Sequence, residues 1–128
     1  MTRAPVYSIL TTDPVLTSLG MTPQTLLGSS PLSSPEVRPF AVAKYGDEQA
    51  FIGSLAQQEL QLWVYDEPGS YVNINKILVR ARELLTVEVV DRVVDGQRFS
   101  TAKWLGNSPD LYDDIYKCIT RYATFTIV

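Results

Sequence analysis

The sequence predicts an α+β fold from a strand that runs into a helix, a hairpin signal, and a strand-like C-terminus. A strand segment that contains Trp63 stops at a Pro-Gly turn, and an amphipathic helix follows at once and runs to Leu85. Asp95-Gly96 lies between extended segments, as in a tight hairpin. We therefore expect a single mostly antiparallel sheet of four to five strands with two main helices packed on one face.

Both helices show apolar residues at helical spacing. The first is expected between Ala4 and Leu19, with a break at Asp13-Pro14, where a capping carboxylate precedes a proline suited to the first helical position. The second is expected to begin after Ser70, a plausible N-cap. Its apolar stripe consists of Ile74, Ile77, Leu78, Ala81, Leu84 and Leu85.

Five segments have the composition of strands. They are Arg38–Tyr45, Leu60–Tyr65, Val87–Val94, Gln97–Leu105 and Cys118–Val128. In the second of them Leu60, Leu62 and Val64 alternate with Gln61, Trp63 and Tyr65, which predicts one aliphatic and one aromatic face. Gly46 to Glu48 is expected to be a turn. Helix-start chemistry at Ser108-Pro109-Asp110 predicts a short helix or turn over Pro109–Lys117.

Residues 22–36 are rich in serine, proline and glycine and have no clear apolar period. We expect a surface loop there, either ordered or mobile. A loop of this length in so small a domain is either a binding loop or a plain connection.

Composition excludes several classes of function. The chain has 128 residues, a formal net charge of −3, no histidine and a single cysteine, Cys118. The lack of histidine removes the usual general base and the commonest zinc ligand, and one cysteine allows neither an internal disulfide nor a cysteine cluster. No segment resembles a membrane span or a signal peptide, so we expect a protein made in the cytoplasm that uses no cofactor or metal.

Charged clusters give no catalytic residues. Asp110, Asp113 and Asp114 could hold magnesium, but an acidic turn, or an acidic knob that contacts a basic patch on a neighbour, is the better interpretation. Arg80 and Arg82 form a basic helix flank, and an enzyme that uses carboxylates and a metal is a remote alternative.

The aromatic side of the predicted sheet is a candidate contact surface. Trp63, Tyr65 and Tyr122 are expected on the face that the helices leave open. An exposed aromatic face of this kind is typical of a subunit interface.

Several motifs together resemble one known family. They are a strand entering Trp63-Val-Tyr-Asp, a helix reading Tyr71-x-x-Ile-x-x-Ile-Leu, an Asp-Gly hairpin, Gly106-x-Ser-x-Asp-Leu-x-Asp, and a terminal Arg121-Tyr-Ala-x-Phe strand. This combination resembles the tail terminator (tail completion) proteins of long-tailed, siphovirus-type bacteriophages. By element order the likeness covers residues 4–128, so we expect one tail-terminator-like domain over 1–128, with its loop at 22–36.

The resemblance implies a homo-oligomeric ring, commonly a hexamer, located in the virion at the head–tail junction. Such a ring caps the major tail tube protein, ends tube polymerisation and binds the head–tail connector, while DNA passes through its lumen without specific recognition. Under this hypothesis Trp63, Tyr65 and Tyr122 pack the subunit interface or the core beneath it, and Arg80 and Arg82 meet an acidic neighbour at that interface. The tube or connector contacts would be Asp95, Gly96, Asp110, Asp113 and Asp114. The alternatives are another head–tail joining ring protein, a stopper or adaptor, or a small soluble binding module that acts as a dimer.

Overall fold

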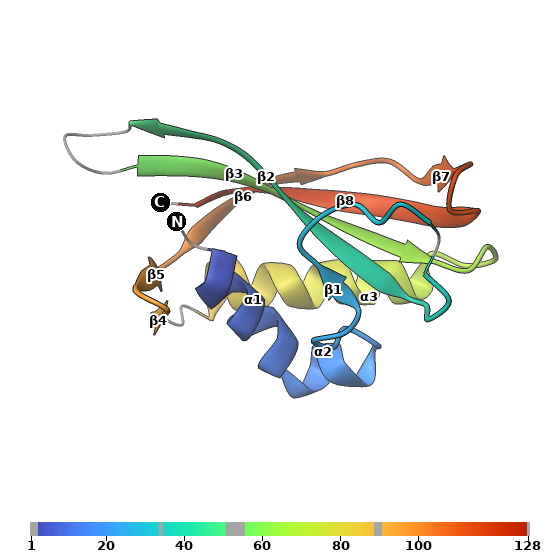
Figure 1. Ribbon diagram of the computed structural model, residues 1–128, viewed down its shortest axis with the longest axis horizontal. Coiled ribbons are helices and arrows are strands. Elements are labelled where there is room, and N and C mark those ends of the chain that lie inside the picture. The colour runs from blue at the N-terminus through green and yellow to red at the C-terminus, as the bar shows by residue number, and fades with distance from the viewer. Residues whose placement is uncertain (1–2, 34, 51–55, 89–90, 128) are drawn as a thin grey trace.

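The computed structural model describes residues 3–33, 35–50, 56–88 and 91–127, and it shows a long sheet with the helices gathered along one of its faces (Figure 1). The helices are α1 (Arg3–Thr12), α2 (Pro14–Ser18) and α3 (Val72–Arg82), and α3 continues into a π-helical turn, η1 (Glu83–Val87). The strands are β1 (Leu26–Leu27), β2 (Phe40–Ala50), β3 (Ala56–Asp66), β4 (Arg92–Val94), β5 (Gln97–Phe99), β6 (Ala102–Asn107), β7 (Leu111–Asp113) and β8 (Cys118–Ile127).

The main sheet has six strands and mixed pairing. Its order is β1-β2-β3-β8-β6, and β7 also pairs with β8. β1 runs parallel to β2, the other pairs are antiparallel, and β4 and β5 form a separate two-stranded sheet. The predicted fold class, one sheet of four to five strands with two main helices, is therefore wrong: the main sheet has six strands, a second small sheet exists, and the described residues contain three α-helices.

The extra strands come from segments without a strand-like sequence pattern. Leu26-Leu27 lies within the serine- and proline-rich segment, yet it pairs with Ala41 and Val42 and buries Leu26. Because two residues are too few to show an alternating pattern, local sequence cannot reveal such a strand.

The core lies between the sheet and the helices. Leu60, Leu62 and Val64 point into it from β3, and the register places Leu62 opposite Ala123 of β8. The predicted stripe of the second helix is confirmed, since its six apolar residues are all buried. Phe99 is also fully buried in this core and anchors the β4–β5 hairpin beneath the end of the sheet.

The predicted break in the first helix is confirmed. Asp13 is the N-cap of α2, and its carboxylate Oδ2 accepts a hydrogen bond of 3.0 Å from the N–H of Leu16. The predicted cap of the second helix is shifted by one residue: Tyr71 is the N-cap, and Ser70 Oγ accepts from the N–H of Val72 at 3.2 Å.

Four local predictions are wrong in whole or in part. The turn expected at Gly46–Glu48 is part of β2, which continues to Ala50 through an irregularity in its pairing with β3. The strand expected at Val87–Val94 is reduced to β4: Val87 is the last residue of η1, and residues 89–90 lie outside the described residues.

The strand expected at Gln97–Leu105 is divided between two sheets. The helix or turn expected at Pro109–Lys117 is right only for its second part, because Leu111–Asp113 form strand β7 and residues 114–117 form a turn.

Within the described part of the chain, no helix is long and apolar enough to cross a membrane.

Candidate assembly surfaces

The outer face of the sheet, opposite the helices, carries an aromatic stack. The rings of Trp63 on β3 and Tyr122 on β8 stack with their centroids 4.2 Å apart, and the Lys44 Nζ lies 4.3 Å from the centroid of the Trp63 ring. Both rings are partly exposed. This half of the face, which we call the open aromatic face, is available to a partner.

The other half of the outer face is closed. Phe40, Tyr65 and Tyr116 pack there. The ring centroids are 4.8 Å apart for Phe40 and Tyr65 and 5.4 Å apart for Tyr65 and Tyr116. The loop before β2 covers this cluster, because the Tyr116 hydroxyl donates to the Pro31 carbonyl and Arg38 Nη2 donates to the Tyr116 carbonyl at 2.8 Å. Tyr65 is only 2% exposed, so the structure places it in a core and not on a free surface.

Burial controls the ionisation of this closed cluster. It raises the pKa of Tyr65 and of Tyr116, and the Asp113 carboxylate raises both further. Burial also raises the pKa of the Cys118 thiol, which is fully buried. A neutral, inaccessible thiol is a poor nucleophile, so Cys118 acts as a packed apolar group.

Arg80 is engaged inside the chain. Its guanidinium contacts the carboxylate of Asp13 through Nη2 at 2.8 Å and Nε at 3.1 Å, and its Nη1 contacts Glu83 at 3.1 Å and Glu88 at 2.9 Å. These hydrogen bonds raise the pKa of Arg80. Arg82, by contrast, is exposed, and its guanidinium carbon lies 3.7 Å from the centroid of the Trp104 ring. Of the two arginines predicted for the interface, Arg82 is the one that a neighbour can reach.

The three carboxylates predicted as one acidic cluster have different environments. Asp110 is exposed and lies 3.5 Å from Arg121 Nε. Asp113 ends β7, and its Oδ1 accepts hydrogen bonds from the N–H groups of Ile115 and Tyr116 at 2.9 and 2.8 Å. Asp114 is exposed in the turn between β7 and β8. The strand geometry therefore spreads these side chains, which a helix would have gathered.

The predicted hairpin is confirmed at Asp95-Gly96. Both residues have positive φ, 51° and 74°, as a two-residue turn with this twist requires. The turn joins β4 and β5 and lies at the rim of a cleft.

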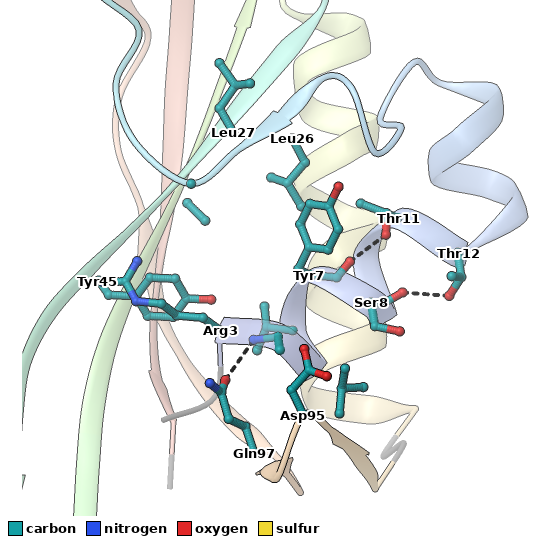
Figure 2. Close-up of a pocket in the computed structure, with 15 residues that line it drawn as sticks. Arg3, Tyr7, Ser8, Thr11, Thr12, Leu26, Leu27, Tyr45, Asp95 and Gln97 are labelled. Atoms are coloured by element: carbon teal, nitrogen blue, oxygen red, sulfur yellow. Dashed lines mark hydrogen bonds between the residues drawn. The ribbon is translucent and has the colours of Figure 1, made fainter.

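This cleft, which we call the α1 cleft, lies between α1, the β1 segment, β2 and the hairpin (Figure 2). Its volume is about 550 Å³, and most of its walls are apolar. The apolar lining includes Val6, Leu26, Leu27, Ala43, Tyr45 and Val94.

Hydrogen bonds fix the walls of the α1 cleft. The Ala4 N–H donates to Gln97 Oε1 at 3.0 Å, and Arg92 Nη1 donates to Ser8 Oγ at 2.9 Å, so the hairpin is tied to α1 at two points. The Tyr7 hydroxyl donates to the Pro23 carbonyl at 2.8 Å on the opposite side. The cleft is therefore built into the fold and does not depend on a loose segment.

Two charged side chains lie at the α1 cleft. The Arg3 guanidinium carbon lies 4.3 Å from the centroid of the Tyr45 ring, and Asp95 projects from the hairpin turn (Figure 2). Burial raises the pKa of Tyr45 to about 12, although the cation of Arg3 opposes this rise. Arg3 and Asp95 are both exposed, and neither forms an ion pair within the described residues.

The α1 cleft was not predicted from the sequence. Apart from Asp95, its residues come from segments without any chemical motif, and they are brought together by the pairing of β1 with β2 and by the docking of the hairpin on α1. Within ranges 3–33, 35–50, 56–88 and 91–127, no group of three or more metal-ligating side chains is present. The surfaces described so far offer no nucleophile with an adjacent base.

Comparison with known proteins shows a likeness of fold to a solved structure. No protein-family model matches the chain, and no curated protein matches it. Among solved structures the chain is similar to one in a structure described as the virion of a native gene transfer agent (GTA) particle, with a TM-score of 0.70 and 16% sequence identity. The likeness covers 95% of this chain and 89% of that one, so the two share a fold over almost their whole length.

Proposed function

We propose that this chain is a structural virion protein that forms a hexameric ring on the tail tube of a long-tailed bacteriophage. The ring ends tube polymerisation and joins the tail to the head connector. The observation that carries the proposal is the shared fold, at a TM-score of 0.70, with a chain of a gene transfer agent virion. The family resemblance of the motifs around Trp63 and Arg121 supports the more specific role in the tail.

The surfaces of the molecule support assembly. The open aromatic face exposes Trp63 and Tyr122 beside Lys44, and Arg82 is exposed at the end of α3. Aromatic and arginine side chains are the groups that most often dominate binding energy at protein interfaces. We assign these residues to contacts between subunits, whereas Tyr65 and Arg80 support the fold beneath them.

The partners under this proposal are further copies of the chain, the major tail tube protein and the head–tail connector. The protein is made in the host cytoplasm and ends in the virion at the head–tail junction. It needs no cofactor and performs no catalysis. A formal net charge of −3 suits a ring through which DNA passes, since a strongly basic lumen would hold phosphate groups.

A polymerisation assay tests the proposal. Purified tube subunits are allowed to elongate with and without this protein, and tube length is measured by negative-stain electron microscopy. We expect shorter tubes with a ring at one end. Tubes of unchanged length and unchanged ends, at concentrations where the protein is present in excess, would contradict capping.

A second assay separates the terminator from the stopper or adaptor. Particles made without this protein are imaged for tail length and for head attachment. A terminator predicts overlong tails without heads, because nothing stops the tube. A stopper or adaptor predicts tails of normal length that fail to join heads.

A further inference from the structure

The molecule carries an exposed apolar side chain at one end and an apolar cleft away from that end. The turn between β7 and β8 lies at one end of the long axis, whereas the N-terminus of α1 and the β4–β5 hairpin lie toward the other (Figure 1). Ile115 in that turn is 80% exposed. The α1 cleft extends from the hairpin and the N-terminus of α1 to β1, and its lining is mainly apolar. A contact between the turn of one copy and the cleft of the next would bury both features.

The turn that presents Ile115 is held in one conformation. Asp113 Oδ1 accepts hydrogen bonds from the N–H groups of Ile115 and Tyr116, and the Tyr116 ring is buried in the closed cluster. A side chain on a rigid support loses little conformational entropy when it binds. Ile115 is therefore preorganised to anchor a contact with another molecule.

The charges around the anchor match those around the α1 cleft. Asp114 and Lys117 flank Ile115 in the turn, both are exposed, and neither forms an ion pair within the described residues. The lining of the cleft includes Arg3 and Asp95, which likewise form no ion pair within the described residues. One acidic and one basic group at each end allow two opposite-charge contacts around one apolar contact.

We propose that the Ile115 turn of one copy inserts into the α1 cleft of the next copy. Asp114 then faces Arg3, and Lys117 faces Asp95. A contact between two different surfaces of the same chain propagates head to tail, and it closes into a ring when the rotation permits. The inference rests on the proposed ring and adds an anchoring contact to the subunit interface that we assigned above to Trp63, Tyr122 and Arg82. It places Asp95, Asp113 and Asp114 between subunits, and not against the tube as the sequence predicts.

Another exposed side chain fits the cleft less well. Leu32, in the loop before β2, is fully exposed, but its neighbours Pro31 and Ser33 carry no charge to match Arg3 and Asp95. The Ile115 turn, by contrast, is flanked by Asp114 and Lys117 and is fixed by two hydrogen bonds to Asp113. The turn is thus the better occupant on charge.

Two variants that block opposite sides of the contact test the proposal. Ile115→Asp removes the anchor, and Gly28→Trp fills the cleft, because a side chain at Gly28 meets nothing within 4 Å and the residue lines the cavity. The matched controls are Val72→Asp on α3, which also replaces an exposed β-branched side chain by aspartate, and Gly28→Ala. Mass is measured by sedimentation over a concentration series, after circular dichroism shows that each variant is folded.

We expect wild type and both controls to assemble, and each blocking variant to associate at least about tenfold more weakly. An equal mixture of Ile115→Asp and Gly28→Trp should give a heterodimer and nothing larger, because one intact cleft meets one intact turn. A mixture that stays monomeric, or a Gly28→Trp variant that assembles like wild type, overturns the inference. A wild-type protein that is monomeric at every concentration also overturns the inference. The proposed function is then tested separately, by whether the protein caps the tube in the polymerisation assay.

Charge exchange gives an independent test of orientation. Arg3→Asp and Asp114→Arg should each weaken association by about two- to fivefold, the range of an exposed ion pair, and the double variant should recover it. Additive losses in the double variant would mean that the two residues do not face each other.

Discussion

The Arg80 guanidinium on α3 and the Asp13 carboxylate that caps α2 form a two-pronged ion pair, with contacts of 2.8 and 3.1 Å. The side chain of Asp13 is only 6% exposed and that of Arg80 only 19%. The pair connects the N-terminal helices to the central helix, so it holds α2 in place on α3. Arg80, which we expected at the subunit interface, therefore stabilises the fold.

Replacement of Asp13 by alanine should destabilise the protein by about 2–4 kcal/mol. The variant loses the helix cap and leaves a largely buried guanidinium without its main partner. Urea denaturation measures the loss. The control is Glu83→Gln, which removes an exposed contact of the same arginine and should cost less than about 0.5 kcal/mol. Equal losses in the two variants would show that burial of the pair has no effect.

The same ion pair predicts a dependence of stability on acid pH. The hydrogen bond from Arg80 lowers the pKa of Asp13 below its usual value of 3.8, although burial opposes the shift. The carboxylate therefore contributes its full stability above about pH 4, and this contribution is lost as the pH falls through the lowered value. Denaturation midpoints between pH 5 and 2 should fall less steeply for Asp13→Asn than for wild type. Parallel curves would contradict the assignment.

Phe99 should be essential for the α1 cleft. It is fully buried and is the anchor that fixes the hairpin beneath the sheet. Phe99→Ala should cost about 3–5 kcal/mol. Val93→Ala, on the exposed side of the same hairpin, should cost less than about 0.5 kcal/mol. Thermal unfolding measures both, and a small effect of Phe99→Ala would show that the hairpin is not held by this ring.

The long periodic elements were predictable from sequence because their pattern and their burial coincide. The stripe of α3 and the alternation of β3 each extend over enough residues to show a period, and both face the core as expected. Trp63 and Tyr122 were likewise placed on one face, where they stack.

The remaining elements depend on pairing between distant segments. Ser108-Pro109-Asp110 has the chemistry of a helix start, but Leu111 and Tyr112 pair with Thr120 and Ile119 of β8, and this pairing decides the outcome. For Tyr65 the sequence left both an interface and a core position open, because the choice depends on the loop containing Pro31 folding over the sheet. The α1 cleft is assembled in the same way from four separate parts of the chain.

Tyrosine ionisation should be delayed in the folded protein. Burial raises the pKa of Tyr45 from its usual value of 10 to about 12 and also raises that of Tyr65. The neutral rings stabilise the fold fully below about pH 10, and this stabilisation is lost as the pH rises through the folded value. A titration followed by ultraviolet absorbance should show late ionisations, one of which disappears in Tyr45→Phe. Ionisation of all seven tyrosines near pH 10 without unfolding would contradict the prediction.

The hydroxyl of Tyr116 should control the loop over the closed half of the sheet. It donates to the Pro31 carbonyl, and the ring itself packs edge-on against the rings of Phe40 and Tyr65. Tyr116→Phe keeps the ring and removes the hydrogen bond, so the global stability should fall by only about 1 kcal/mol. Limited proteolysis between residues 28 and 37 should become faster, whereas cleavage elsewhere should not change. The control is Tyr112→Phe, on an exposed ring of β7, which should leave the cleavage rate as in wild type. If the two variants are cleaved at the same rate, the loop is held by its other contacts, such as that of Arg38 with the Tyr116 carbonyl.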